Sequence, residues 1–342
     1  MMEIDSTPLP PRNKGKGKLV PVELDGLPWV EKYRPNDLSE LVSHEEITDT
    51  LKTFIEKNRL PHLLFYGPPG TGKTSTILAC AKKIYGNKFG SSILELNASD
   101  DRGIDVVREQ IVNFASTKTI YRTDFKLIIL DECDNMTNAA QAALRRVIEK
   151  YTKNVRFCII CNYVSKIIPA IQSRCTRFRF SPLALEQVEH RLNVIVEKEH
   201  VQLTENGKKA LLRLCKGDMR RALNILQACH AGYEQVDEEA VYNCTGHPQP
   251  QHIDSILQTM LRDEYTTAYQ RIERMCIDHG YALQDIVTDV FEKLQEADLP
   301  SETEMNMVTQ LADIEYRLGE GANEKIQLGS MIGAFKLALP VV

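Results

Sequence analysis

Between residues 60 and 180, short apolar runs alternate with stretches whose apolar residues recur at helical spacing. Alternation of this kind predicts a parallel β-sheet with helices on both faces. The run 127–130 is apolar throughout, which is typical of a central strand buried on both sides. The predicted strands are 62–66, 92–97, 125–130, 155–161 and 177–180, and the predicted helices are 73–85, 103–116, 138–151 and 166–172.

After Pro182 the strand pattern stops and only helical periodicity remains. A turn-rich segment at 245–250 divides this helical part in two. At the other end of the chain, residues 1–26 are rich in Pro, Gly and Lys, which predicts a disordered basic tail. The predicted organisation is a tail at 1–26, an α/β domain at 27–181, a small helical domain at 182–245 and an all-α domain at 246–342.

Composition narrows the class of protein. Of the 342 residues, 43% are hydrophobic and 26% are charged, as in ordinary soluble chains. The net charge of −5 excludes a protein that coats nucleic acid over its whole surface, so any DNA-binding surface must be a local patch. No apolar stretch approaches the roughly 20 residues that span a membrane, and the N-terminus lacks a secretory signal. We therefore expect an intracellular protein without membrane contact.

The nine cysteines form no dense framework, which fits reduced thiols inside a cell. Cys158 and Cys161 have the spacing of metal ligands, but they lie on a predicted strand, where residues three apart point to opposite faces. No second pair follows at the spacing of a zinc site. We therefore predict that both thiols are small core residues.

The most specific motif is Gly-Pro-Pro-Gly-Thr-Gly-Lys-Thr at residues 67–74. It lies between a predicted strand and a predicted helix, which is the context that a phosphate-binding loop requires. Glycines let backbone N–H groups close around a polyphosphate, and the helix N-terminus adds partial positive charge. Lys73 is then expected to reach the β- and γ-phosphates, and Thr74 to supply a hydroxyl to Mg²⁺.

Two acidic residues end the apolar run 127–130. Ligand sites gather at the carboxyl ends of parallel strands, so Asp131 and Glu132 are expected near the phosphate-binding loop. Asp131 suits a Mg²⁺ ligand, usually through water. Glu132 suits a base that orients and activates a water for attack on the γ-phosphate.

Together, these two motifs resemble those of the AAA+ ATPases. Three further segments narrow the resemblance. Leu-Pro-Trp-Val-Glu-Lys-Tyr-Arg-Pro at 27–35 and Leu-Asn-Ala-Ser-Asp-Asp-Arg-Gly at 96–103 are similar to segments of clamp-loader subunits, and Ser-Arg-Cys at 173–175 matches the motif that carries their arginine finger. Over residues 27–338, the chain resembles the small subunits of eukaryotic replication factor C, of the subunit-5 type.

The resemblance implies roles for individual residues. Asn162 matches the sensor-1 position and would bond the γ-phosphate or the attacking water. Arg220 matches sensor 2 and would reach the γ-phosphate from the second domain. Arg174 would be an arginine finger for ATP held by the neighbouring subunit, so the expected catalytic residues are Lys73, Glu132, Asn162 and Arg174. The expected nucleotide-binding residues are Val30, Tyr33, Arg34, Pro35, Gly67, Pro68, Pro69, Gly70, Thr71, Gly72, Lys73, Thr74, Ser75, Asn162 and Arg220.

The family also contacts duplex DNA near the start of the helix predicted at 103–116. A helix N-terminus and a nearby Arg together can bind one phosphate, which is the role expected of Arg102. The alternative is that Arg102 only forms ion pairs with neighbouring acidic residues. Asn97 is expected to pair with Glu132 and hold it inactive until DNA binds. The residues expected to contact DNA are Arg102, Gly103, Ile104 and Arg108.

The resemblance implies an AAA+ domain with a parallel sheet, then a helical lid and an all-α collar. It implies an ATP-hydrolysing, Mg²⁺-dependent subunit of a heteropentameric, nuclear clamp loader. Such a loader opens the sliding clamp, proliferating cell nuclear antigen, and loads it onto primer–template DNA for replication and repair. One alternative is a non-hydrolysing scaffold subunit, which the intact Lys73 and Glu132 disfavour. The other is a homohexameric AAA+ helicase or remodeller, which would lack the Ser-Arg-Cys motif and the collar.

Overall fold

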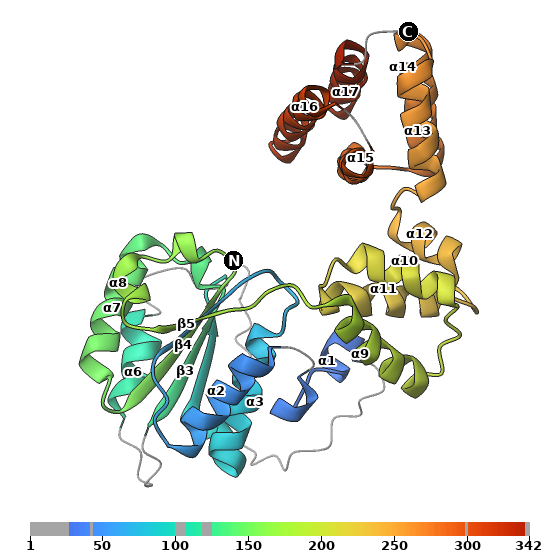
Figure 1. The fold of residues 1–342 in the computed structure, drawn as a ribbon. Coiled ribbons are helices and arrows are strands. Elements are labelled where there is room, and N and C mark those ends of the chain that lie inside the picture. The colour runs from blue at the N-terminus through green and yellow to red at the C-terminus, as the bar shows by residue number, and fades with distance from the viewer. Residues whose placement is uncertain (1–26, 42–43, 100–106, 118–124, 298–299, 339–342) are drawn as a thin grey trace, which may run out of the picture.

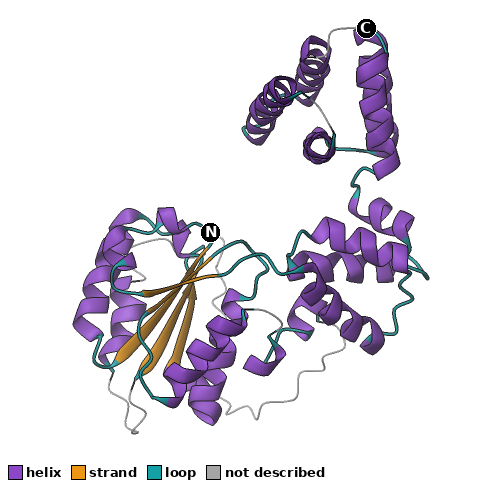
Figure 2. Ribbon diagram, in the orientation of Figure 1, coloured by secondary structure: helices purple, strands orange, loops and turns teal. Residues whose placement is uncertain are grey.

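A parallel sheet of five strands forms the centre of the first half of the chain (Figures 1 and 2). We describe the protein from a computed structural model, which covers residues 27–41, 44–99, 107–117, 125–297 and 300–338. The strand order is β2-β3-β4-β1-β5, and every pairing is parallel, as the alternating pattern predicts. The strands are β1 Leu63–Tyr66, β2 Ile93–Asn97, β3 Lys126–Asp131, β4 Val155–Cys161 and β5 Thr176–Arg179.

The parallel register brings the carboxyl ends of the strands to one edge of the sheet. Asn97 is paired with Asp131 across β2 and β3, and Tyr66 with Cys161 across β1 and β4. The loop after β1, the acidic pair at the end of β3 and the polar residue after β4 therefore meet at this edge. Sites in parallel sheets form at such edges because the connecting loops project beyond the strands there.

Helices cover both faces of the sheet, with α6, α7 and α8 on one side and α2 and α3 on the other (Figure 1). Two separate clusters of buried apolar side chains lie under these layers. Cys158 belongs to one cluster and Cys161 to the other, so the prediction of buried core residues on opposite faces is confirmed. The helices are α2 Glu45–Glu56, α3 Lys73–Tyr85, α4 Phe89–Ser92, α6 Val112–Ser116, α7 Asn138–Tyr151 and α8 Pro169–Gln172.

The helices differ from their prediction in two places. The single helix predicted at 166–172 is divided into a 3₁₀ turn, Val164–Lys166, and α8. Ile168 between them is extended, with ψ of 142°, because the residue before a proline is disfavoured in the α conformation. Residues 103–106 of the helix predicted at 103–116 lie outside the described residues, and the rest is a π-helical turn, Val107–Ile111, followed by α6.

A second, all-helical domain follows the sheet, and we call it the lid (Figure 1). Asp218 caps its helix α11, because its Oδ1 accepts hydrogen bonds from the backbone N–H groups of Arg220 at 2.8 Å and Arg221 at 3.1 Å. The short helix α1, Trp29–Lys32, also packs here, although it precedes the sheet in sequence. The lid helices are α9 Leu185–Lys198, α10 Glu205–Cys215, α11 Met219–Gly232 and α12 Glu238–Thr245.

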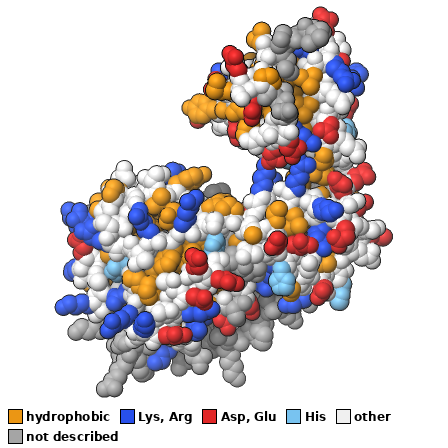
Figure 3. All heavy atoms as spheres, in the orientation of Figure 1, with side chains coloured by type: hydrophobic (Ala, Val, Ile, Leu, Met, Phe, Trp, Pro, Cys, Tyr) orange, Lys and Arg blue, Asp and Glu red, His pale blue; other side chains and the backbone are white. Residues whose placement is uncertain are grey.

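A third helical bundle, the collar, lies beyond the lid (Figure 1). Basic side chains of the lid meet acidic ones of the collar at their junction (Figure 3), where Lys216 and Arg213 lie 2.8 and 3.8 Å from Glu292. No described helix is long and apolar enough to cross a membrane. The collar helices are α13 Pro250–Arg262, α14 Tyr265–His279, α15 Leu283–Glu296, α16 Ser301–Gly319 and α17 Glu324–Ala338.

His62, just before β1, gives the sheet a testable acid sensitivity. Its Nδ1 accepts a hydrogen bond from the backbone N–H of Phe157 at 3.1 Å, and burial together with the nearby Arg156 lowers its pKa to about 4. An unfolded chain protonates this ring near pH 6.5, whereas the folded chain keeps it neutral to lower pH. The contribution of His62 to the free energy of unfolding is therefore fully present above pH 6.5 and is lost as the pH drops towards 4. The expected loss below pH 4 is about 3 kcal/mol, because a pKa lowered from 6.5 to about 4 corresponds to that difference in free energy.

The measurement is the midpoint of thermal unfolding between pH 4 and 8 for the natural chain and for His62→Asn. Asparagine keeps an acceptor for the Phe157 N–H but does not titrate in this range. The midpoint should therefore fall less steeply with acid in the variant. Parallel curves for the two proteins would show that His62 does not carry this sensitivity.

Candidate functional site

The loop between β1 and α3 has the conformation that its glycines permit. Gly67, Gly70 and Gly72 all have positive φ, and Gly72 is the residue before the first turn of α3. A side chain at Gly67 would place its Cβ 2.0 Å from the backbone oxygen of Phe180. The loop can therefore lie close to the strand end at Phe180 only because position 67 has no side chain.

Lys73 is the first residue of α3, and its side chain reaches back to this loop. Its Nζ donates hydrogen bonds to the carbonyl oxygens of Gly67 at 2.8 Å and Pro68 at 2.7 Å, and to Oδ1 of Asn162 at 3.1 Å. Burial lowers the pKa of this amine, while the charge of Asp131 acts in the opposite direction. The Lys73 side chain therefore joins the loop after β1 to the residue that follows β4.

The acidic pair at the end of β3 lies beside the start of α3. Thr74 Oγ1 donates to Asp131 Oδ2 at 2.6 Å, and Asp131 Oδ1 accepts from the backbone N–H of Glu132 at 2.8 Å. Glu132 has φ of +52°, a left-handed conformation that residues other than glycine rarely adopt. A hydroxyl and a carboxylate at this separation, both lining the same cleft, are donors of the kind that Mg²⁺ binds.

The structure does not contain the predicted pairing of Asn97 with Glu132. Oδ1 of Asn97 accepts instead from the backbone N–H of Ser99 at 3.0 Å. The Glu132 carboxylate accepts from the side-chain amide of Asn135 at 3.1 Å. The correction has a local cause, because the turn after Glu132 brings Asn135 back towards it, with the Asn135 N–H bonded to the Glu132 carbonyl at 2.9 Å.

Asn162 follows β4 directly and faces the cleft. Its backbone N–H donates to Oδ2 of Asp134 at 3.3 Å, while its side chain accepts from Lys73. Asp134 therefore ties the end of β4 to the turn after β3. Sequence reasoning did not assign Asp134 this contact, because it depends on the pairing of the two strands.

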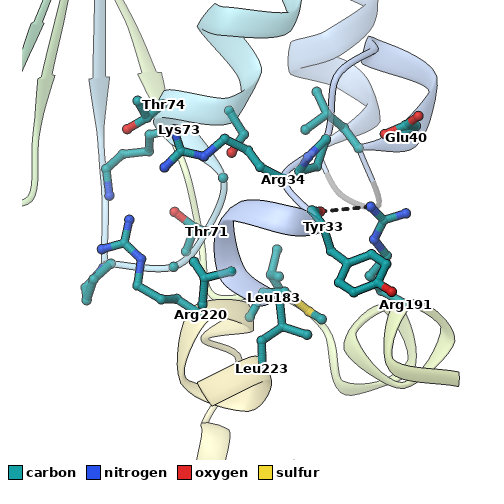
Figure 4. Close-up of a pocket in the computed structure, with 18 of the residues that line it drawn as sticks. Tyr33, Arg34, Glu40, Thr71, Lys73, Thr74, Leu183, Arg191, Arg220 and Leu223 are labelled. Carbon is teal, nitrogen blue, oxygen red and sulfur yellow. Dashed lines mark hydrogen bonds between the residues drawn. The ribbon is translucent and has the colours of Figure 1, made fainter. Parts of the chain in front are cut away.

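One cleft of about 180 Å³ collects most of the predicted nucleotide-binding residues (Figure 4). Gly67 and Pro68 do not line it, but their carbonyls accept from Lys73. Arg220 reaches the cleft from the lid. The predicted residues that line it are Val30, Tyr33, Arg34, Pro35, Pro69, Gly70, Thr71, Gly72, Lys73, Thr74, Ser75, Asp131, Glu132, Asn162 and Arg220.

The lid and the η1 turn, Leu38–Glu40, add cleft residues that sequence reasoning missed. They lie on helices or turns whose cleft-facing side is set only by how the lid packs against the sheet domain. No local motif marks them. These additional lining residues are Glu40, Leu41, Leu183, Gln187, Arg191, Met219 and Leu223.

Arg174 is not among the residues that line this cleft. Its guanidinium lies 2.5 Å from the Glu149 carboxylate of α7 and donates to the backbone oxygen of Ala170 at 2.6 Å. Arg145 pairs with the same carboxylate at 3.1 Å, and these two arginines lower the pKa of Glu149. Arg174 is therefore held on the surface of α7 and α8, away from the chain's own cleft.

Of the four residues predicted to contact DNA, the structure describes only the backbone of Arg108. Arg102, Gly103 and Ile104 lie outside the described residues. The backbone of Arg108 belongs to the turn Val107–Ile111.

Comparison with known proteins identifies the family. A model of the ATPase family associated with various cellular activities (AAA) matches residues 63–183, and a model of the replication factor C C-terminal domain matches residues 248–334. Replication factor C subunit 3 of Schizosaccharomyces pombe is 57% identical over 94% of this chain and 96% of its own length. This chain belongs to the replication factor C subunits. Human replication factor C subunit 5 is also 57% identical, over 94% of each chain.

Membership makes this replication factor C subunit an AAA+ ATPase and a component of a clamp loader that assembles with other replication factor C subunits. Among solved structures, the RuvB Holliday junction branch migration motor of Thermotoga maritima matches with a TM-score of 0.51, over 67% of this chain and 79% of its own. Its sequence identity is only 14%, so this likeness concerns the fold alone. It agrees with the predicted AAA+ fold.

Proposed function

We propose that this replication factor C subunit binds ATP in the cleft of Figure 4 and hydrolyses it within the assembled clamp loader. The observation that carries the proposal is the convergence of Lys73, Thr74, Asp131, Glu132 and Asn162 in one cleft. These residues come from three separate segments at the carboxyl edge of the sheet: the start of α3, the end of β3 with the residue after it, and the residue after β4. A scaffold subunit without hydrolysis has no need of a carboxylate at position 132.

Each polar residue of the cleft has a role that its position supports. Lys73 and Arg220 would neutralise phosphate charge from opposite sides, since one belongs to α3 and the other to α11. Glu132 would accept a proton from the attacking water on a carboxylate oxygen. Asn162 would orient that water or the terminal phosphate. The contact with Asn135 keeps the Glu132 carboxylate in a defined position until it is used.

Thr74 and Asp131 are the residues that would hold Mg²⁺. Their oxygens lie 2.6 Å apart at the start of α3 and the end of β3, so a hydroxyl and a carboxylate face the same point. When bound, Mg²⁺ neutralises the charge of the β- and γ-phosphates. Asp131 also accepts from the Glu132 N–H, so the same carboxylate would orient both the metal and the base.

Arg174 would act on the ATP of a neighbouring subunit. Its place on the surface of α7 and α8, outside the chain's own cleft, supports this assignment. An arginine supplied by another chain stabilises the charge that develops on the transferred phosphoryl group. Assembly would then be a condition for hydrolysis, because each site needs residues from two subunits.

The partners follow from the same proposal. The loader would open the sliding clamp, proliferating cell nuclear antigen, and release it closed on primer–template DNA in the nucleus, during replication and repair. Arg102, Gly103, Ile104 and Arg108 stay the proposed contacts to the DNA backbone. Contacts of this kind position a protein on DNA without reading its sequence, which suits a loader that acts at any primer end.

Removal of the Lys73 amine tests nucleotide binding in this cleft. Lys73→Ala should weaken ATP binding to the full-length chain by about 10- to 100-fold, because charge-assisted bonds to phosphate are lost. The measurement is a calorimetric titration with ATP, with and without Mg²⁺. Lys83→Ala is the matched control, since Lys83 is an exposed lysine of the same helix. Equal affinities for the two variants would place the nucleotide elsewhere.

A further inference from the structure

The short helix α1 and the residues after it form one wall of the cleft, yet they are attached to the lid rather than to the sheet domain. Trp29 is only 7% exposed and lies within the apolar core of the lid. Its backbone N–H donates to Oε1 of Gln227 in α11 at 3.0 Å, and its ring lies 5.6 Å from the ring of His230. The start of the wall is thus embedded in the second domain.

Two polar residues, one within α9 and one directly after its last residue, hold the rest of the wall. Arg191 donates from Nη2 to the backbone oxygen of Tyr33 at 3.1 Å (Figure 4). Glu199 accepts from the Tyr33 hydroxyl and lies 2.6 Å from the amine of Lys32. Burial and the bond to Glu199 raise the pKa of Tyr33 to about 12, so its hydroxyl stays a donor even in alkaline solution.

The partners change a few residues further along the chain. Asn36 accepts a hydrogen bond from Lys82, which belongs to α3 of the sheet domain. Leu38 is buried in the core between the sheet and helices α2 and α3. The passage from lid contacts to sheet-domain contacts therefore falls between Tyr33 and Asn36.

We infer that residues 29–33 move with the lid as one unit, and that Arg191 and Glu199 are positioning residues which hold this wall against the base of the bound nucleotide. The inference rests on the proposed binding of ATP in this cleft. Phosphates would contact the loop on the sheet domain, while the base would contact Val30 and Tyr33 on the lid. Bound ATP would then bridge the two domains, with its phosphates on the sheet domain and its base on the lid.

The test uses the full-length chain with Arg191→Met and Glu199→Ala combined. Trp29 is the only tryptophan of the chain, so its fluorescence reports directly on the wall. Loss of the two contacts should shift Trp29 emission to longer wavelength, because the ring gains water. The dissociation constant for ATP should rise about tenfold, while that for inorganic tripolyphosphate, which has no base, should change by less than about twofold.

Two further variants sharpen the result. Glu197→Ala removes an exposed carboxylate of the same helix that makes no hydrogen bond or ion pair with any described residue, and it should behave as the natural chain. Tyr33→Phe removes only the hydroxyl that Glu199 accepts from, and it should weaken ATP binding in the same direction by a smaller factor.

Two outcomes would overturn the inference. Unchanged Trp29 emission in the double variant would mean that the wall is held without these contacts. Equal weakening of ATP and tripolyphosphate would mean that Arg191 and Glu199 support the whole lid rather than the base-side wall. Failure of the proposed function is distinct, because it would leave the binding of both ligands unaffected by Lys73→Ala.

Discussion

Glu132→Gln should lower ATP turnover at this subunit's site by about 100- to 10,000-fold in the assembled clamp loader, with ATP binding preserved. Glutamine has nearly the shape of glutamate and still accepts a bond from Asn135, but it does not take a proton from water at neutral pH. The measurement is phosphate release in a single turnover, with clamp and primer–template DNA present. The phase contributed by this site should disappear.

Glu46→Gln is the matched control, because it neutralises an exposed carboxylate on α2, outside the cleft. It should leave every phase of phosphate release unchanged. A Glu132→Gln complex with all phases intact would favour the alternative in which this subunit binds ATP as a scaffold. Calorimetric titration of the same variant separates that outcome from a loss of binding, since the proposal requires ATP affinity to persist.

Arg174→Ala is expected to have the second large effect, at a site on another chain. In the reconstituted complex it should lower hydrolysis at the neighbouring subunit by about 1,000-fold or more, which is the usual contribution of an arginine finger. This subunit's own ATP binding should not change, because Arg174 does not line its cleft. The two measurements are single-turnover hydrolysis in the complex and ATP titration of the full-length chain.

Arg145→Ala gives a control within the same ion-pair group, since Arg145 and Arg174 share the Glu149 carboxylate. It tests whether loss of a positive charge beside Glu149 is enough to slow hydrolysis at the neighbouring site. We expect the rate of Arg145→Ala to be unchanged. Arg174→Lys keeps the positive charge without the planar fork of donors, and it should recover only part of the rate. If Arg174→Ala left the neighbouring site at full rate, the assignment across subunits would be wrong.

Glu149 is the partner that Arg174 has in the single chain and would have to leave in the assembled complex. In the single chain its carboxylate lies 2.5 Å from the Arg174 guanidinium, so the arginine is already neutralised on its own surface. A phosphate of the neighbouring site would have to replace this partner. Arg145, 3.1 Å from the same carboxylate, would remain as a partner of Glu149 if Arg174 moved to the neighbouring site.

Sequence alone was sufficient for the parts of the molecule that depend on local geometry. The alternation of apolar runs and helical stretches predicted five parallel strands, and their bounds agree to within one residue. The glycines of 67–72 predicted the loop, because positive φ and close approach are properties of the backbone itself. Asp131 and Glu132 were predicted beside that loop because parallel strands end at one edge. These inferences require only neighbouring residues and the periodicity of a strand or helix.

Contacts between distant segments were decided only by the tertiary structure. The pattern at 27–35 did not indicate that Trp29 lies in the lid core, or that Arg191 and Glu199, more than 150 residues later, hold Tyr33. Nor did the sequence around β2 and β3 distinguish Asn135 from Asn97 as the partner of Glu132, since both are amides near the same edge of the sheet. Such contacts depend on how whole helices and strands pack, and a difference of one helical turn would exchange one partner for another. The sequence thus determined at which edge of the sheet the proposed ATP-binding cleft lies, and the packing of the lid decided which residues close it.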